Sequence, residues 1–192
     1  MNNIIKKGPF MGMVFTNLIF QCFVAYTAAI NSDKSHVDKN LILYLVAFVG
    51  TFMSLIVVKM SIPMKVLVFT IFSGVSGAIL SRNERTPQMI KEVAMIFAGM
   101  LILGLVSIQL KIDLRPYTPI LVAGLMGLIV SQMFGATRKD TGRIGTLMFA
   151  MFVVFNTNNI LQKKYEGDFV QASLDYFIDI MNLLNYAEDD LV

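Results

Sequence analysis

The chain has 192 residues, of which 56% are hydrophobic and only 15% are charged, and its formal net charge is +3. With its positive mean hydropathy, this composition excludes an ordinary soluble domain and indicates a protein whose solvent is a lipid bilayer. Its lysines and arginines are spread over short connectors and do not gather in a basic patch, so we expect no nucleic-acid partner.

Seven apolar segments follow one another along the chain, and most are long enough to cross a hydrocarbon core of roughly 30 Å. The polar connectors between them are too short to hold a soluble domain. Because lipid excludes open sheet edges and the segments do not alternate every second residue, we predict an all-α, polytopic bundle of seven transmembrane helices, one domain over residues 1–192. The expected spans cover residues 9–30, 41–58, 62–81, 93–110, 117–137, 144–162 and 169–186.

The first apolar segment follows two lysines, as the core of a signal peptide does. It is too long for a signal peptide and lacks a convincing small-residue cleavage site, so we predict a retained first helix. Lysines and arginines are divided equally between the two sides of the seven-helix arrangement, and the positive-inside rule therefore assigns no orientation.

Sequence motifs for enzyme chemistry do not occur. His36 is the only histidine and Cys22 the only cysteine, and the chain has no phosphate-binding glycine loop, metal-binding histidine pair or nucleophile triad. We expect no enzyme activity, no catalytic residues and no cofactor.

Two patterns in the apolar segments indicate helix packing. Asn17 and Gln21 share one face of the first segment, and we predict that they form interhelical hydrogen bonds. Small residues at every fourth position of the fifth segment predict a seam where a neighbouring helix approaches closely. These residues are Ala123, Gly127, Ser131 and Gly135.

The seventh segment is the only one that carries carboxylates. Asp175, Asp179 and Asn182 fall within about 60° of one another on a helix, and Asp179 lies about 15 Å into the segment, near the bilayer midplane. A charged side chain there costs roughly 2.5–3.5 kcal/mol, so this polar stripe should face the interior of the bundle. The alternative is an interfacial or re-entrant last helix, with six spans and its acids in water.

The closing segment "FNTNNILQKKYEGDFVQASLDYFIDIMNLL" resembles the end of the transmembrane Bax inhibitor motif family. In that family "YDT" near the end of the sixth helix is followed by "GD", "AxL" and "YLDIxNLF" in the seventh. Here "FNT" takes the place of "YDT", and "YFIDIMNLL" matches the final motif. The first segment and "IFSGVSGAILS" in the third are similar to the family in a more general way.

The resemblance implies a seven-helix bundle, with the last helix near its centre, that acts as a pH-sensitive calcium leak channel and is linked by name to cell-death control. It implies the endoplasmic reticulum or another internal membrane in a eukaryote or a virus-infected cell, and the plasma membrane in a bacterium. Two family aspartates are thought to share protons and control opening. The second is Asp179 here, and the first is replaced by Asn156, beside a retained Thr157.

This departure changes the expected chemistry. Two carboxylates in contact hold a proton between them, whereas an asparagine amide donates a hydrogen bond to ionised Asp179 and favours its charged form. Asp175, one turn away, is the candidate for a displaced second acid. In the family a basic residue of the second helix latches to the first aspartate; Lys59 is the candidate latch here, with Asp175 as its partner, or else a lysine that snorkels to the interface.

We therefore expect a membrane cation channel, with calcium as the permeant ion and with altered pH gating. Asp179 and Asp175 would bind cations transiently, and Asn156, Thr157 and Asn182 would line the path, because hard cations prefer oxygen ligands. Two alternatives stay open. One is a non-conducting regulator of cell death that binds other membrane proteins, and the other is a proton-coupled transporter that uses Asp179 as its proton carrier.

Overall fold

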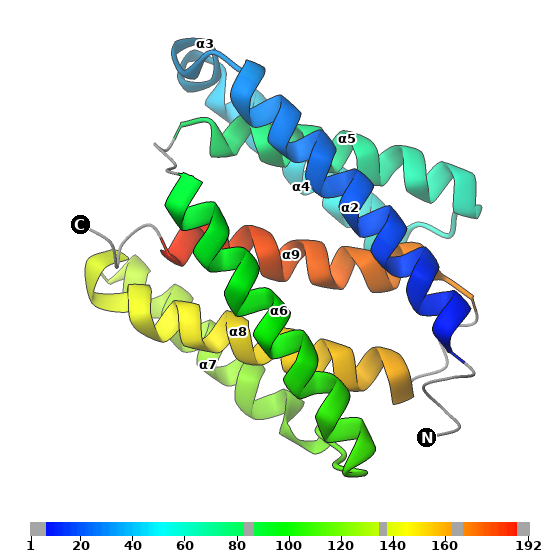
Figure 1. Cartoon of the computed structure of the whole chain (residues 1–192). Helices are drawn as coiled ribbons and strands as arrows, with labels where there is room; N and C mark the ends of the chain where they lie inside the picture. Colours follow the sequence, from blue (N-terminus) through cyan, green and yellow to red (C-terminus); the bar gives the residue numbers. More distant parts are fainter. Residues whose placement is uncertain (1–6, 83–86, 135–137, 163–166, 188–192) are drawn as a thin grey trace. The chain divides into compact units, whose positions relative to one another are not determined.

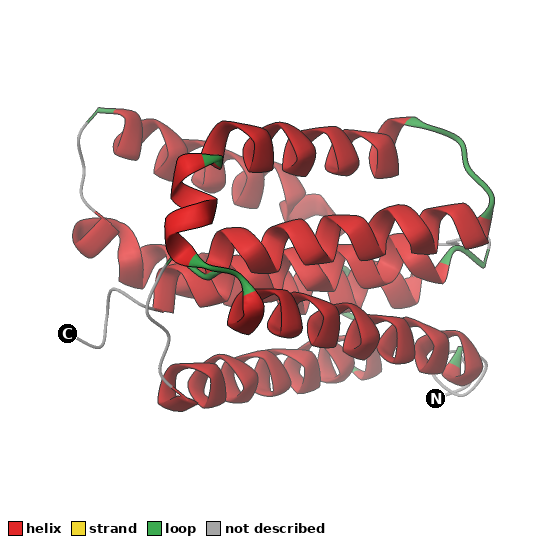
Figure 2. Ribbon diagram, turned by 90° about the horizontal axis from the view of Figure 1, so that it is seen from above, coloured by secondary structure: helices red, strands yellow, loops and turns green. Residues whose placement is uncertain are grey.

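The computed structural model describes residues 7–82, 87–134, 138–162 and 167–187. Within these residues the secondary structure is helical and contains no strand (Figure 2). The α-helices are α2 (Gly8–Asn31), α3 (Lys34–Lys39), α4 (Leu41–Val57), α5 (Ile62–Leu80), α6 (Pro87–Gln109), α7 (Thr118–Met133), α8 (Arg138–Gln162) and α9 (Phe169–Ala187), with a 3₁₀ turn, η1 (Arg115–Tyr117), before α7.

The helices reproduce the predicted spans, and the differences lie at helix ends. α6 begins at Pro87 and α8 at Arg138, each six residues before the predicted span, because hydropathy marks the part of a helix that lies in lipid and not its polar first turns. Proline suits the first turn of a helix, where no backbone N–H partner is needed. The short helix α3 was not predicted; Asp33 caps it by accepting a hydrogen bond from the backbone N–H of Ser35.

The chain divides into two compact units. One, called here the α2–α5 unit, comprises Gly8–Glu84 and Tyr165–Phe177. Within it α5 packs against both α2 and α4 (Figure 1). A Cβ on Gly77 would lie 2.0 Å from the carbonyl oxygen of Ala25, so glycine is required where α5 meets the backbone of α2. Phe69 and Phe72 of α5 pack edge-on against Phe177, with ring centroids 5.3 and 5.9 Å apart.

The other unit, called the α6–α8 unit, comprises Met1–Lys7, Arg85–Lys164 and Ile178–Val192. Here α8 packs against both α6 and α7 (Figure 1). The predicted seam on α7 is wrong: Ala123 and Gly127 are exposed, and a Cβ on Gly127 would meet nothing within 4 Å. The contact is made instead by Gly124, whose added Cβ would lie 3.2 Å from the Met148 side chain. Gly135 lies outside the described residues.

The surface of the helices is apolar. Large hydrophobic side chains are exposed along most of them, including Ile42 at 80% and Phe23 at 65%. Within the described residues three helical stretches are long and apolar enough to cross a membrane, Gly8–Asn31, Ile62–Leu80 and Thr141–Gln162, and shorter apolar helices cover Leu41–Val57, Val93–Gln109 and Thr118–Ser131. Such a surface suits lipid and not water, so the chain is a polytopic integral membrane protein. Its treatment as a single domain stays a prediction.

Candidate functional site

The structure places Asn156 of α8 in contact with Asp179 of α9, within the α6–α8 unit. The amide nitrogen Nδ2 of Asn156 donates a hydrogen bond to the carboxylate oxygen Oδ2 of Asp179 over 2.8 Å. Asp179 is only 4% exposed, although it lies about 15 Å from the start of its helix. Asn156 lies about 9 Å from the end of α8. We call this contact the Asn156–Asp179 pair.

Burial of Asp179 bears on the alternative in which α9 lies at the membrane surface. An interfacial helix keeps one face, with its acids, in water. Here Asp179 and its neighbours Leu174, Tyr176 and Leu183 are all buried. The structure therefore places Asp179 itself against protein, and the interfacial or re-entrant last helix stays an alternative.

For the other predicted site residues the structure gives the position but does not test the predicted role. Asp175 and Asn182 are half-buried on α9, one turn before and one turn after Asp179. Lys59 is exposed in the connection between α4 and α5 and forms no ion pair within the described part of the chain. The cation-binding and latch roles of these residues stay predictions.

Thr157 contributes to helix packing beside the pair. Its side chain is fully buried, and its hydroxyl donates to the backbone carbonyl of Val153 over 2.7 Å. A Cβ on Gly104 would lie 2.4 Å from the Cβ of Thr157, so the backbone of α6 lies directly against α8 at this level. The hydroxyl of Thr157 thus bonds to its own helix, and its predicted place along an ion path stays a prediction.

Asn158 is a site residue that was not predicted from the sequence. Its fully buried amide donates to the hydroxyl of Ser107 and to the carbonyl of Ile112, both over 2.8 Å, and accepts from the backbone N–H of Leu114 over 3.2 Å. Gln162 also donates to Asn158, over 2.9 Å. Asn158 therefore fixes the second half of α8 to the end of α6 and the connection that follows, and so positions Asn156 two residues away.

Lys7, close to the N-terminus, contacts the C-terminal end of α8. Its ammonium donates to the carbonyl of Ile160 over 3.3 Å, and partial burial lowers the pKa of Lys7 from its ordinary value. A cation at the C-terminal turn of a helix is favoured because the last carbonyls carry partial negative charge. Lys7 thus adds a second restraint on the segment that carries Asn156.

An ion pair in the α2–α5 unit holds the start of α9. Lys65 of α5 donates to the carboxylate of Asp168. Asp168 also caps α9 by accepting from the backbone N–H of Gln171 over 3.0 Å. The "GD" of the closing motif was the signal in the sequence, but its partner is 103 positions away and could not be assigned.

The prediction for Asn17 and Gln21 is confirmed within the α2–α5 unit. Asn17 donates to the hydroxyl of Ser173 over 2.5 Å, and Gln21 donates to the hydroxyl of Thr70 over 3.3 Å. The buried oxygen Oε1 of Gln21 and hydroxyl of Ser73 have no hydrogen-bond partner within the described part of the chain. These contacts join α2 to α5 and to the first half of α9.

Binding of a cation at Asp179 stays a prediction. No group of three or more His, Cys, Asp or Glu side chains that could hold a metal ion occurs among the described residues. A cation at Asp179 would thus depend on carboxylates of α9 and on neutral amide and hydroxyl oxygens, a ligand set that holds hard cations loosely.

Two comparisons with known proteins agree with the resemblance in the closing segment. A family described as "Inhibitor of apoptosis-promoting Bax1" matches residues 9–186. The chain is also similar to the "Golgi anti-apoptotic protein" of vaccinia virus strains Lister, LC16m0 and LC16m8, with 29% identity over 92 residues in each case. That alignment covers 45% of this chain and 39% of the viral protein. The predicted resemblance is confirmed, and the chain belongs to the family of inhibitors of apoptosis-promoting Bax1.

Proposed function

We propose that this member of the Bax inhibitor family is a membrane channel through which calcium leaks down its gradient, and that the Asn156–Asp179 pair lies on the ion path. The observation that carries the proposal is a carboxylate, 4% exposed and deep in a membrane protein, held by an amide from a neighbouring helix. Acidic residues at such depth are costly to insert and mark ion or proton pathways.

The chemistry of the pair suits passage of calcium. Calcium binds oxygen ligands, and the amide of Asn156 carries an oxygen beside the nitrogen that donates to Asp179. Rotation of the amide by half a turn would replace the donor by this oxygen, so that Asp179 and Asn156 together present two oxygens to a cation. One carboxylate and one amide bind weakly enough for the ion to leave.

The Asn156–Asp179 pair also bears on how channel opening depends on pH. An amide has no proton to share near neutral pH, whereas two carboxylates in contact do. We propose that opening depends less on pH here than in a channel with two facing acids, unless Asp175 supplies the second acid from one turn away. Lys59 is the candidate cation for a closed-state latch to Asp175.

A second function has separate support. The viral relative is named for an anti-apoptotic activity in the Golgi. The alternative is a non-conducting regulator of cell death in an internal membrane, which acts by binding other membrane proteins through its exposed apolar helices. A proton-coupled transporter, with Asp179 as proton carrier, is the third reading of the same buried acid.

Flux through the purified chain separates these functions. The full chain is reconstituted alone into liposomes that contain a calcium-sensitive dye, and calcium influx is recorded with and without a proton gradient. A channel admits calcium without a gradient or co-substrate. Influx that requires a gradient indicates a transporter. Influx no greater than in protein-free liposomes under either condition would reject conduction and leave the regulator.

A further inference from the structure

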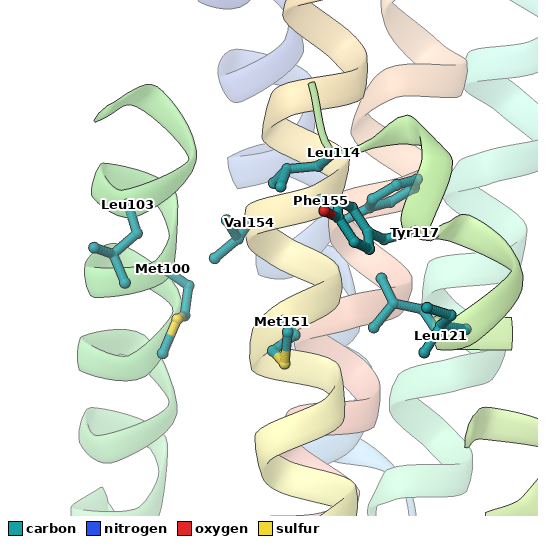
Figure 3. A pocket seen from close by; sticks show the side chains of 9 residues that line it. Met100, Leu103, Leu114, Tyr117, Leu121, Met151, Val154 and Phe155 are labelled. Carbon is teal, nitrogen blue, oxygen red and sulfur yellow. The ribbon is translucent and has the colours of Figure 1, made fainter. Parts of the chain in front are cut away.

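A pocket of about 570 Å³ lies within the α6–α8 unit, and neither Asn156 nor Asp179 lines it. Figure 3 shows Met100 and Leu103 of α6 on one side and Leu121 of α7 on the other, with Met151 and Val154 of α8 between them. The volume falls in the range of pockets that bind small ligands. Two methionines in the lining add adaptable surface, since their unbranched side chains fit ligands of irregular shape.

The lining restricts the chemistry of the occupant. All its side chains are hydrocarbon or thioether except for that of Tyr117, which carries one hydroxyl. A polar ligand would lose its hydrogen bonds to water in such a pocket, and apolar cavities do not hold water well either. The pocket therefore fits an apolar occupant.

The position of the pocket along the helices matches one leaflet of a bilayer. Leu103 and Met100 lie about 9 and 14 Å from the end of α6 at Gln109, and Met151 lies about 16 Å from the end of α8. Tyr117 marks the outer end of the pocket, at the level of the helix ends, directly before α7 begins. The pocket thus runs from the level of the helix ends inward by about half of a 30 Å hydrocarbon core, which is the length of one lipid tail.

Residues at the outer end suit the headgroup region. Tyrosines are enriched at membrane interfaces, and Tyr117, 54% exposed, lies at this end of the pocket. Lys111 and Asp113, both exposed in the connection that follows α6, add charged groups of both signs at this end, where lipid headgroups lie. From the apolar lining, the depth and this outer end, we infer that the pocket binds one acyl chain of a membrane phospholipid, as a defined site distinct from the lipid that surrounds every span.

Photolabelling tests the site. The full chain is reconstituted with a phosphatidylcholine that carries a diazirine near the middle of one acyl chain, irradiated, and mapped by peptide mass spectrometry. We expect labelling at Met100, a half-buried residue of the pocket, to exceed labelling at Leu147, an exposed residue of α8, by about tenfold, because a bound tail stays against the pocket. Labelling that simply follows exposure, with Leu147 labelled as strongly as Met100, would reject the site.

A matched pair of variants extends the test. Val154→Phe fills the pocket and should lower labelling at Met100 by about tenfold, whereas Leu147→Phe adds the same ring on a lipid-facing position and should leave labelling at Met100 unchanged. Leu121→Phe fills the pocket from α7. It replaces Val154→Phe in the test if Val154→Phe melts at a lower temperature than the parent. Unchanged labelling in a folded pocket-filling variant would overturn the proposal.

Discussion

Replacing Asn156 with aspartate restores the acid that the closing motif lacks and tests whether the Asn156–Asp179 pair controls opening. The amide nitrogen and the carboxylate oxygen are 2.8 Å apart, so Asn156→Asp would place two carboxylates in contact without other changes in size. The two acids could then either hold one proton between them or move apart. The parent pair has no such choice, because an amide does not titrate.

The repulsion is large enough to decide the outcome. Two unit charges 2.8 Å apart repel by about 6 kcal/mol at an effective dielectric constant of roughly 20. At about 1.4 kcal/mol per factor of ten, the doubly ionised contact is disfavoured by roughly four powers of ten. The contact in Asn156→Asp therefore requires a proton, and loss of that proton on raising the pH should drive the two helices toward a second conformation.

Calcium influx into proteoliposomes between about pH 6 and pH 8 is the assay. A change governed by one proton is limited to about tenfold per pH unit, or about a hundredfold over these two units. We expect the influx ratio between these pH values to differ from the parent's by roughly three- to tenfold, which lies within this limit. Asn31→Asp adds the same charge at the exposed end of α2 and should keep the parent's profile. If Asn156→Asp and the parent have superimposable profiles, the pair is not the proton switch. A steep parent profile that only Asp175→Asn abolishes would move the switch to Asp175 and Asp179.

The remaining predictions concern packing and access. Gly104→Ala should lower the free energy of unfolding in detergent by about 1–3 kcal/mol, because the added methyl group clashes with Thr157 of α8. Gly127→Ala is the control and should not destabilise the protein, because the added methyl group meets open space. Equal melting temperatures of the two variants would contradict the close contact between Gly104 and α8. Asn158→Leu should cost about 1–3 kcal/mol for each buried group left unpaired, and an unchanged melting temperature would remove its positioning role. In a cysteine-free background, a cysteine that replaces buried Asp179 should react with a small cationic thiol reagent about tenfold more slowly than a cysteine that replaces exposed Lys59. Both reactions should nevertheless go to completion. If the cysteine at position 179 does not react, a water-filled path to the buried site is excluded.

Hydropathy predicted the helices well because lipid imposes a minimum apolar length on each span. It located α4 and α5 to within one residue of their ends. It could not locate the polar first turns of α6 and α8, which are helical outside the apolar stretch, nor α3, which depends on a local cap. The small residues on α7 led to a wrong prediction for a related reason. Small residues are as compatible with a lipid-facing surface as with a helix contact, and the sequence does not show that no helix of the described part of the chain lies against Gly127.

Part of the candidate site could be predicted from the sequence. The closing motif indicated that Asn156 and Asp179 belong together, and the hydrogen bond between them is present. Asn158 was not distinguished from the other polar residues of the same stretch, because the rotation of α8 relative to α6 decides which amide is buried against Ser107. The pairing of Lys65 with Asp168 joins distant parts of the chain and leaves no local signal.

The most direct test of the central claim compares calcium influx through the parent with that through Asp179→Asn, in liposomes that contain no other protein. Asp33→Asn is the matched control, because Asp33 is exposed and asparagine also caps a helix well. If Asp179 lies on the ion path, neutralising it should reduce influx by about tenfold or more, since a calcium ion loses its charged ligand, while Asp33→Asn conducts as the parent does. Equal influx through the parent and both variants would contradict the assignment of Asp179 to the path.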